Sequence, residues 1–130
     1  MNNAQKLLNL AKSASLKAYA PYSNFYVGAG ILSDSGKFYS GCNVENVSYP
    51  VGTCAEAGAI SAMIAGGDKN IKEILIYAPS KELISPCGAC RQRIAEFANG
   101  DTLIHLANND GIQQTFTIAE LLPLSFKDIK

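Results

Sequence analysis

The residues with the clearest chemical use in this sequence are three cysteines in two short motifs. Cys54 begins a Cys-Ala-Glu segment, and Cys87 and Cys90 lie in a Ser-Pro-Cys-Gly-Ala-Cys segment. Each segment stands at the start of a predicted helix. If Ser85 caps the second helix with Pro86 at its first position, Cys87 and Cys90 share a face. Two thiolates there and a third from the other helix match a catalytic zinc with one open position. We therefore expect these cysteines to bind Zn²⁺.

An acidic residue accompanies the first motif. Glu56 stands two residues after Cys54, near enough to reach a metal-bound water without being a ligand. Zinc lowers the pKa of a bound water to about 7, and a nearby carboxylate can then carry protons between water, substrate and leaving group. Each helix N-terminus also carries about half an elementary positive charge, which favours thiolates. These residues predict hydrolytic deamination, with Glu56 as the catalytic proton carrier.

Each of these features also has a simpler interpretation. Thr53-x-x-Glu56 is a well-formed capping box, which on its own is usually structural. A Cys-x-x-Cys pair at a strand-to-helix junction is also the pattern of a redox dithiol. Cys42 would make a closed four-cysteine zinc site, although a small buried strand residue is the favoured interpretation. His105, the only histidine, lies in a strand pattern and is interpreted as a packing or surface residue and not a ligand.

Apolar periodicity and turn signals predict alternating helices and strands around these motifs. The predicted helices cover residues 3–18, 55–65 and 87–98. The predicted strands cover residues 25–32, 37–43, 71–78, 102–107 and 113–117. A turn at 34–36 joins the first two strands as a hairpin, so the pattern predicts an α/β fold with a mixed sheet. Gly58 inside the second helix costs about 1 kcal/mol in propensity, and we expect it at a close packing contact.

Length and composition exclude several classes of protein. The chain has 130 residues with 48% hydrophobic and 17% charged residues, which fits a single domain spanning residues 1–130 and excludes disorder. A net charge of zero argues against a nucleic-acid or anionic membrane partner. No apolar stretch of about 20 residues spans a membrane. Ala18-Tyr19-Ala20 resembles a signal-cleavage site, but the segment before it contains lysines where a signal peptide has an unbroken apolar core. Four cysteines are also too few for a disulfide scaffold, so we expect a cytoplasmic protein.

The motifs together resemble those of a known enzyme family. Cys54-Ala55-Glu56 and the Pro-Cys-Gly-Ala-Cys-Arg-Gln run at 86–92 are similar to the small homotetrameric cytidine deaminases of pyrimidine salvage, and zinc deaminases as a class share this signature. Further matching segments follow in the same order at 22–29, 41–46, 49–50, 121–123 and Phe126. The resemblance thus covers residues 22–126, nearly the whole chain.

The resemblance implies a fold and a reaction. The fold would be a three-layer α/β/α sandwich with a mixed, roughly five-stranded sheet. Cytidine and 2′-deoxycytidine would be hydrolysed to the uridines and ammonia, with zinc hydroxide attacking C4 of the pyrimidine. Cys54, Cys87 and Cys90 would bind one Zn²⁺ per subunit. Glu56 would protonate the ring nitrogen and then pass a proton to the departing amine.

The resemblance also implies residues that bind the substrate. Asn43 and Glu45 would hydrogen-bond the ribose hydroxyls, which fits their polar groups, while Phe25 would pack on the pyrimidine. Backbone groups around Ala55 and Ser85 would contact the base edge.

Residues for assembly follow from the same resemblance. Tyr49 and Phe126 would close the pocket of a neighbouring subunit in a homotetramer. The partners expected are therefore a small-molecule nucleoside and further copies of the same chain.

One position departs from the family pattern. Many members carry an arginine just after the catalytic glutamate, where it offsets the thiolate charge, and this chain has Ala57. We expect Arg91 or backbone amides to supply more of that compensation. A deaminase of another aminopyrimidine nucleoside, such as blasticidin S, is the nearest alternative, although Asn43-x-Glu45 favours a true ribose.

Overall fold

The computed structural model describes residues 1–127. Its helices are α1 (Asn3–Ser15), α2 (Ala55–Ala65), α3 (Gly88–Phe97) and α4 (Ile118–Leu121), with a 3₁₀ turn η1 (Tyr49–Val51). Its strands are β1 (Gly28–Ser33), β2 (Phe38–Cys42), β3 (Ile71–Tyr77), β4 (Leu103–Asn108) and β5 (Gly111–Phe116). One sheet has the order β2-β1-β3-β4-β5. Its β3–β4 pair is parallel and the other pairs are antiparallel, so the predicted mixed sheet is confirmed.

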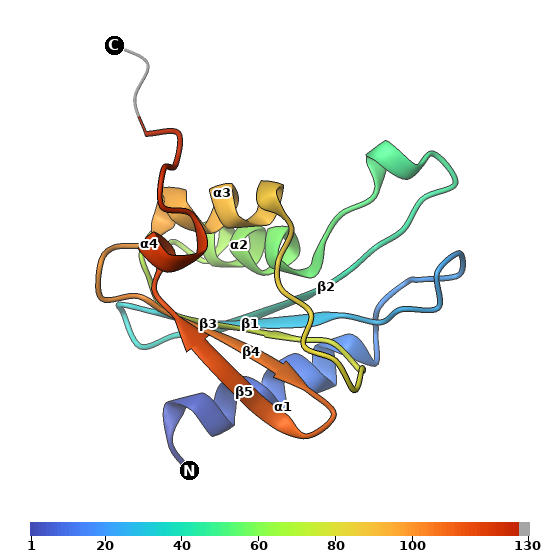
Figure 1. Ribbon diagram of the computed structural model, residues 1–130, viewed down its shortest axis with the longest axis horizontal. Helices are drawn as coiled ribbons and strands as arrows, with labels where there is room; N and C mark the ends of the chain where they lie inside the picture. Colours follow the sequence, from blue (N-terminus) through green and yellow to red (C-terminus); the bar gives the residue numbers. More distant parts are fainter. Residues whose placement is uncertain (128–130) are drawn as a thin grey trace.

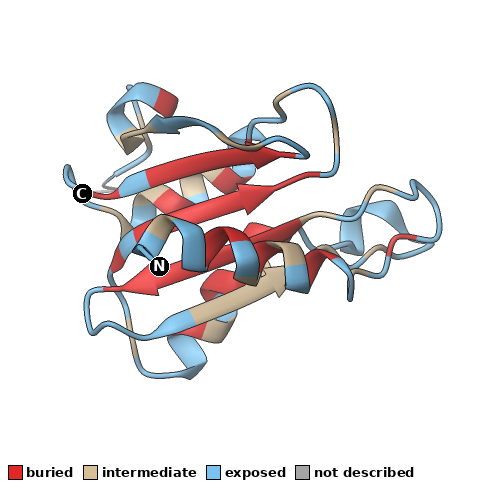
Figure 2. Cartoon of the chain, turned by 90° about the horizontal axis from the view of Figure 1, so that it is seen from below, coloured by how far each residue is buried: buried red, intermediate tan, exposed pale blue. Residues whose placement is uncertain are grey.

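Helices cover both faces of the sheet and form three layers. On one face α1 packs against β1, β2 and β3, and on the other α2 packs against β1 and β2 with α3 beside it (Figure 1). Met63, Ile74 and Ile104 belong to the apolar cluster under α2, and Leu7 and Leu75 to the cluster under α1. The central strands are almost wholly buried (Figure 2). The predicted α/β/α sandwich is confirmed. None of the helices within residues 1–127 has the length and apolarity to cross a membrane.

The sheet topology brings the N-termini of α2 and α3 together. Strands β2 and β3 are both antiparallel to β1, so they run in the same direction and end at the same edge of the sheet. The chain enters α2 after β2 and α3 after β3. Both helices therefore begin at the carboxyl edge of these strands, which is where open α/β sheets form their ligand sites.

Several predicted boundaries are wrong by one to three residues, and specific contacts explain three of them. Helix α1 ends at Ser15 and not at residue 18, because Tyr19 pairs with the segment after β2. Strand β1 begins at Gly28 and not at residue 25, because the Asn43 side chain binds the backbone of residues 25–27. Helix α3 has Cys87 as its N-cap and not Ser85, whose hydroxyl accepts a hydrogen bond from Arg91.

Helix α2 lies almost directly on strand β2 at a glycine. A Cβ on Gly41 would lie 2.3 Å from the Ala59 nitrogen and 2.6 Å from the Ala55 oxygen, both in the α2 backbone. Within the chain the expected close contact at Gly58 is not found, since a Cβ there would meet its nearest atom at an ordinary 3.5 Å. A close contact of Gly58 between subunits stays a prediction. The close approach of α2 to β2 therefore depends on Gly41 in the strand and not on Gly58 in the helix.

We expect Gly41→Ala to destabilise the protein by about 1–3 kcal/mol, because the methyl group must push the α2 backbone away from the sheet. Urea denaturation measures this loss as a lower midpoint. Gly100→Ala is the matched control, since a Cβ at Gly100 meets no atom within 4 Å. Equal midpoints for the two variants would contradict the assignment of Gly41 as the close-packing position.

Candidate active site

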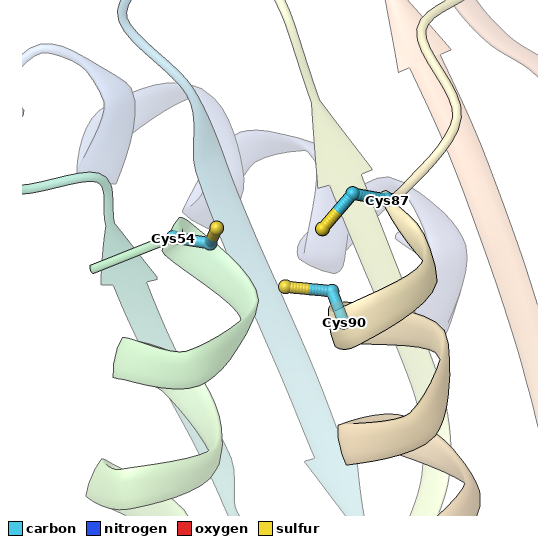
Figure 3. A group of neighbouring side chains, drawn as sticks. All are labelled: Cys54, Cys87 and Cys90. Atoms are coloured by element: carbon cyan, nitrogen blue, oxygen red, sulfur yellow. The ribbon is translucent and has the colours of Figure 1, made fainter. Parts of the chain in front are cut away.

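Three sulfur atoms converge where α2 and α3 begin. The Sγ atoms of Cys54, Cys87 and Cys90 lie within 4.8 Å of one another, and the three side chains point into the same space (Figure 3). Cys54 is the N-cap of α2, Cys87 is the N-cap of α3, and Cys90 lies in the first turn of α3. Zinc–sulfur bonds of about 2.3 Å place tetrahedral sulfurs about 3.8 Å apart. The cluster therefore fits one Zn²⁺ with three protein ligands.

Neither α2 nor α3 begins with a side-chain cap. Neither Cys54 nor Cys87 makes a side-chain capping hydrogen bond, and the predicted Thr53-x-x-Glu56 capping box is not formed because Cys54 occupies the N-cap. The backbone amide of Cys90 lowers the pKa of the Cys87 thiol, and that of Ala89 adds to the effect. The pKa of Cys87 is thus shifted in the predicted direction, toward the thiolate.

The other two thiols lie in a less favourable environment. Burial raises the pKa of Cys54 and of Cys90, and the nearby Glu56 carboxylate raises both further. A coordinated zinc ion reverses this preference, because it deprotonates a thiol ligand outright. The donor set is therefore suited to a dication and less suited to free thiolates, which argues against the redox-dithiol interpretation.

Glu56 lies beside the cluster in the first turn of α2. Only 5% of the residue is exposed, and its carboxylate is not part of the group of converging ligand atoms. Burial raises the pKa of Glu56, while hydrogen bonds from its own backbone amide and from Cys90 lower it. Burial thus favours the protonated form of Glu56 more than in water, which suits a carboxyl that accepts and then donates a proton.

The arginine nearest to the sulfurs is one that the motifs did not indicate. Arg93 Nη1 lies 3.4 Å from Cys90 Sγ, and the hydrogen bond to Cys90 raises the pKa of Arg93. The expectation for Arg91 is not met, because its guanidinium donates to the carbonyls of Pro86 and Leu121 and to Ser85 Oγ. The one-turn spacing from Cys90 to Arg93 is the sequence signal for this contact.

Two adjoining cavities open beside the sulfurs. The smaller has a volume of about 190 Å³, and its lining includes Cys54, Ala55, Glu56 and Cys87. The larger has a volume of about 460 Å³ and lies between the residue 22–23 loop and the segment 43–54. Asn43 and Cys54 line both cavities. A ligand with a flat ring and a polar appendage can thus place the ring beside Glu56.

The polar residues predicted to bind a sugar first bind the neighbouring loop. Asn43 Oδ1 accepts from the Val27 amide at 2.9 Å, and its Nδ2 donates to the Phe25 carbonyl at 2.8 Å. Glu45 accepts from the amides of Tyr22 and Ser23 and from the Ser23 hydroxyl. The Ser23 hydroxyl holds the pKa of Glu45 below its usual range. Both residues follow β2 and do not lie within it.

The predicted aromatic residues have three different positions. Tyr49 lines the larger cavity and stacks edge-on against Tyr22 at a centroid distance of 6.0 Å. Phe25 is half-buried, and within residues 1–127 it lines neither cavity. Phe126 exposes 67% of its surface, while Gln92 hydrogen-bonds both its backbone nitrogen and its oxygen. Phe126 therefore lines neither of the two cavities beside the sulfurs.

Two residues considered as ligands lie outside the cluster. Cys42 is not among the converging sulfurs of the described chain, so no four-cysteine site forms there. Cys42 is also partly exposed, whereas a buried residue was expected. His105 is buried between Glu73 and Thr115, each 2.8 Å from a ring nitrogen. His105 is therefore a packing residue, as predicted.

Comparisons with known proteins agree with this geometry. Residues 1–106 match the family model described as the cytidine and deoxycytidylate deaminase zinc-binding region. The chain is 42% identical over 124 residues to a cytidine deaminase from Sporosarcina psychrophila, across 95% of this chain and 91% of the relative. It is 41% identical over 122 residues to one from Halalkalibacterium halodurans, across 94% and 92%.

Solved structures give the same result. A crystal structure of cytidine deaminase from Burkholderia pseudomallei has a TM-score of 0.90 and 39% identity, covering 97% of this chain and 100% of that one. The cytidine deaminase from Mycobacterium tuberculosis has a TM-score of 0.83 and 33% identity, covering 98% and 99%. The cluster of three cysteines, the fold and the family match all agree, and the chain belongs to the cytidine and deoxycytidylate deaminase family with its zinc-binding region.

Proposed function

We propose that this protein hydrolyses cytidine and 2′-deoxycytidine to uridine and 2′-deoxyuridine, with release of ammonia. The observation that carries the proposal is the convergence of three sulfurs beside the buried Glu56 at the wall of a cavity. Relatives named cytidine deaminases, at about 40% identity over most of the chain, support it. A redox dithiol does not explain the third sulfur, and a closed structural zinc site needs a fourth ligand that the cluster within residues 1–127 does not include.

Glu56 is the residue we assign to proton transfer. When bound, the zinc ion supplies a water acidic enough to lose its proton at neutral pH. The Glu56 carboxylate takes up that proton and delivers it to the ring nitrogen next to C4. It then takes the remaining proton of the added hydroxyl at C4 and delivers it to the departing amine. Its buried position beside Cys54 and Cys87 excludes bulk water from these transfers. The backbone at Ala55, buried at the start of α2, lies where we expect the base edge.

We assign ribose recognition to the larger cavity. Glu45 is ionised and fixed by its three bonds to Tyr22 and Ser23, and a carboxylate has lone pairs left for sugar hydroxyls. Asn43 uses one amide hydrogen for the Phe25 carbonyl and retains the other. Phe25, held by this bond, is the proposed packing partner of the pyrimidine.

We expect Glu45→Gln to raise the KM for cytidine about 10–100-fold with a smaller change in kcat, because a hydrogen bond to a charged group contributes about 1.5–3 kcal/mol. Steady-state kinetics test this, with Glu96→Gln on the exposed side of α3 as the control. Because the pKa of Glu45 is lowered, the wild-type KM should stay constant as pH falls to about 5 and rise only below the usual carboxyl range. An unchanged KM in the variant would contradict this role.

We propose that the active form is a homotetramer in which Tyr49 and Phe126 close the pocket of a neighbouring subunit. Both rings are largely exposed in the single chain, at 75% and 67%, and Val47, Val51 and Leu124 are exposed as well. Exposed apolar side chains of this size are typical of association surfaces. Light scattering that shows a stable, fully active monomer would contradict the tetramer.

The activity is tested by incubating the zinc-loaded protein with cytidine, 2′-deoxycytidine and blasticidin S. We expect ammonia equimolar with uridine from cytidine and with 2′-deoxyuridine from 2′-deoxycytidine, and much slower turnover of blasticidin S. Absence of turnover on both nucleosides would overturn the proposed function. We expect no nucleic-acid substrate, given the net charge of zero. The cytoplasm stays our prediction for the compartment, and the four free cysteines are consistent with it.

A further inference from the structure

The three sulfurs of the cluster do not have equal electrostatic support. Cys54 and Cys87 occupy N-cap positions, at the positive ends of the α2 and α3 dipoles, and the backbone amides of Ala89 and Cys90 also act on Cys87. Cys90 lies inside α3, and its side chain is fully buried. The cationic group that reaches Cys90 is the Arg93 guanidinium, whose Nη1 is 3.4 Å from the sulfur. Among the hydrogen bonds of residues 1–127, it alone joins a cationic side chain to a sulfur of the cluster.

The net charge of the zinc-bound cluster explains why the contact between Arg93 and Cys90 matters. Three thiolates around Zn²⁺ leave one net negative charge, and an ionised Glu56 beside them adds a second. Helix termini offset part of this charge at Cys54 and Cys87, whereas Cys90 depends on a side chain. The other arginine of the motif is unable to help, because Arg91 is held by the carbonyls of Pro86 and Leu121.

We propose that Arg93 is a positioning residue of the zinc centre, which holds the Cys90 thiolate and neutralises the excess negative charge of the three-sulfur site. Cys90 and Arg93 stand one helical turn apart, so the helical conformation of α3 itself places the guanidinium beside the sulfur. Partners of a metal ligand orient it and tune its affinity for the metal. The inference depends on zinc binding by the cluster and not on the identity of the substrate.

The test is the zinc affinity of the purified protein, measured by competition with a chromophoric chelator in the absence of nucleoside. We expect Arg93→Gln to bind zinc about 10–100-fold more weakly, and Arg93→Lys to lie between it and the wild type, because an ammonium keeps the charge but not the planar fork. Lys72→Gln removes the same charge at an exposed position near the start of β3 and serves as the control. We expect that control to bind zinc like the wild type.

A second substitution that restores a positive charge near the sulfurs distinguishes a loss of charge from a loss of packing as the cause of weaker zinc binding. Ala57 stands one turn after Cys54 on α2, as Arg93 stands one turn after Cys90 on α3. We expect Ala57→Arg in the Arg93→Gln background to recover at least half of the lost affinity on a logarithmic scale. A zinc affinity of Arg93→Gln within about threefold of the wild type would overturn the proposal, and so would equal losses in Arg93→Gln and Lys72→Gln.

A second measurement keeps the proposal falsifiable if the zinc affinities are too tight to compare. In the cobalt-substituted protein, loss of the Arg93 hydrogen bond should shift the thiolate-to-cobalt absorption band, while Lys72→Gln should leave it in place. An identical band in Arg93→Gln and the wild type would contradict the contact. Because neither readout uses cytidine, failure of the proposed deaminase activity would leave this test unaffected.

Discussion

Replacing Glu56 by Gln is expected to remove nearly all turnover of cytidine while zinc stays bound. The amide has the size of the carboxyl but is unable to carry a proton, and general acid–base catalysis contributes about 10²–10⁴-fold to a rate. Glu56 moves more than one proton in the proposed reaction, so we expect a loss at the upper end of this range. Glu56 is not part of the converging ligand group, which is why the metal should remain.

The measurement for this variant pairs kcat with zinc content on the same sample. Glu96→Gln, an exposed residue of α3, provides the control for an equivalent change of charge. A Glu56→Gln protein that keeps a tenth or more of the wild-type kcat would show that another group carries the protons. Loss of zinc together with activity would instead place Glu56 among the ligands.

Replacing Cys90 by Ala is expected to remove both zinc and activity. The sulfur is fully buried between α2 and α3, so the variant loses a ligand and leaves a small cavity. Two remaining thiolates hold zinc far more weakly, and we expect zinc to fall from about one ion per chain to a small fraction after gel filtration. Because metal binding contributes to folding, the thermal midpoint of the isolated variant should fall too.

Cys42→Ala is the matched control for this loss. Cys42 ends β2 and lies outside the sulfur cluster, so its removal should leave the zinc content and the turnover of cytidine unchanged. Metal analysis and the ammonia assay on both variants check the pair of expectations. Zinc that survives in Cys90→Ala, or is lost in Cys42→Ala, would contradict the ligand set.

Local patterns were sufficient for the elements that carry the ligands. The Ala-rich run predicted a helix at residues 55–65, and α2 has those bounds. The start of α2 follows from the sequence, because a run of strong helix formers begins directly after Cys54, and Cys54 takes the extended conformation of an N-cap residue. The alternation of helices and strands likewise predicted the mixed sheet, because short connections leave few topologies open.

Local patterns failed where a distant residue supplies the partner. Ser85 is a good capping residue in isolation, but its hydroxyl binds Arg91 and the cap moves to Cys87. Residues 25–27 alternate like a strand, yet their backbone binds the Asn43 side chain instead of a neighbouring strand. The Asn43 contacts join positions 16 and 18 residues apart and the Ser85 contact joins positions six apart. Periodicity of apolar residues contains no information about either kind of side-chain partner.

Some residues of the candidate site could be predicted from the sequence and others could not. Cys54, Cys87 and Cys90 followed from ligand count and helix position, and the structure brings their sulfurs together. Arg93 was missed, although its spacing from Cys90 was available, because a charged residue on a helix is more often solvated. The roles of the aromatic residues at 49 and 126 depend on an assembly, so a single chain leaves them as proposals.

X-ray absorption at the zinc edge of the purified protein tests the three-sulfur site most directly. We expect one zinc per chain with three sulfur ligands at about 2.3 Å and a single light ligand, oxygen or nitrogen, at about 2.0 Å. That result requires the cluster of Cys54, Cys87 and Cys90 to leave one position for water or substrate. A spectrum with four sulfur ligands, or a protein that binds no zinc, would contradict it.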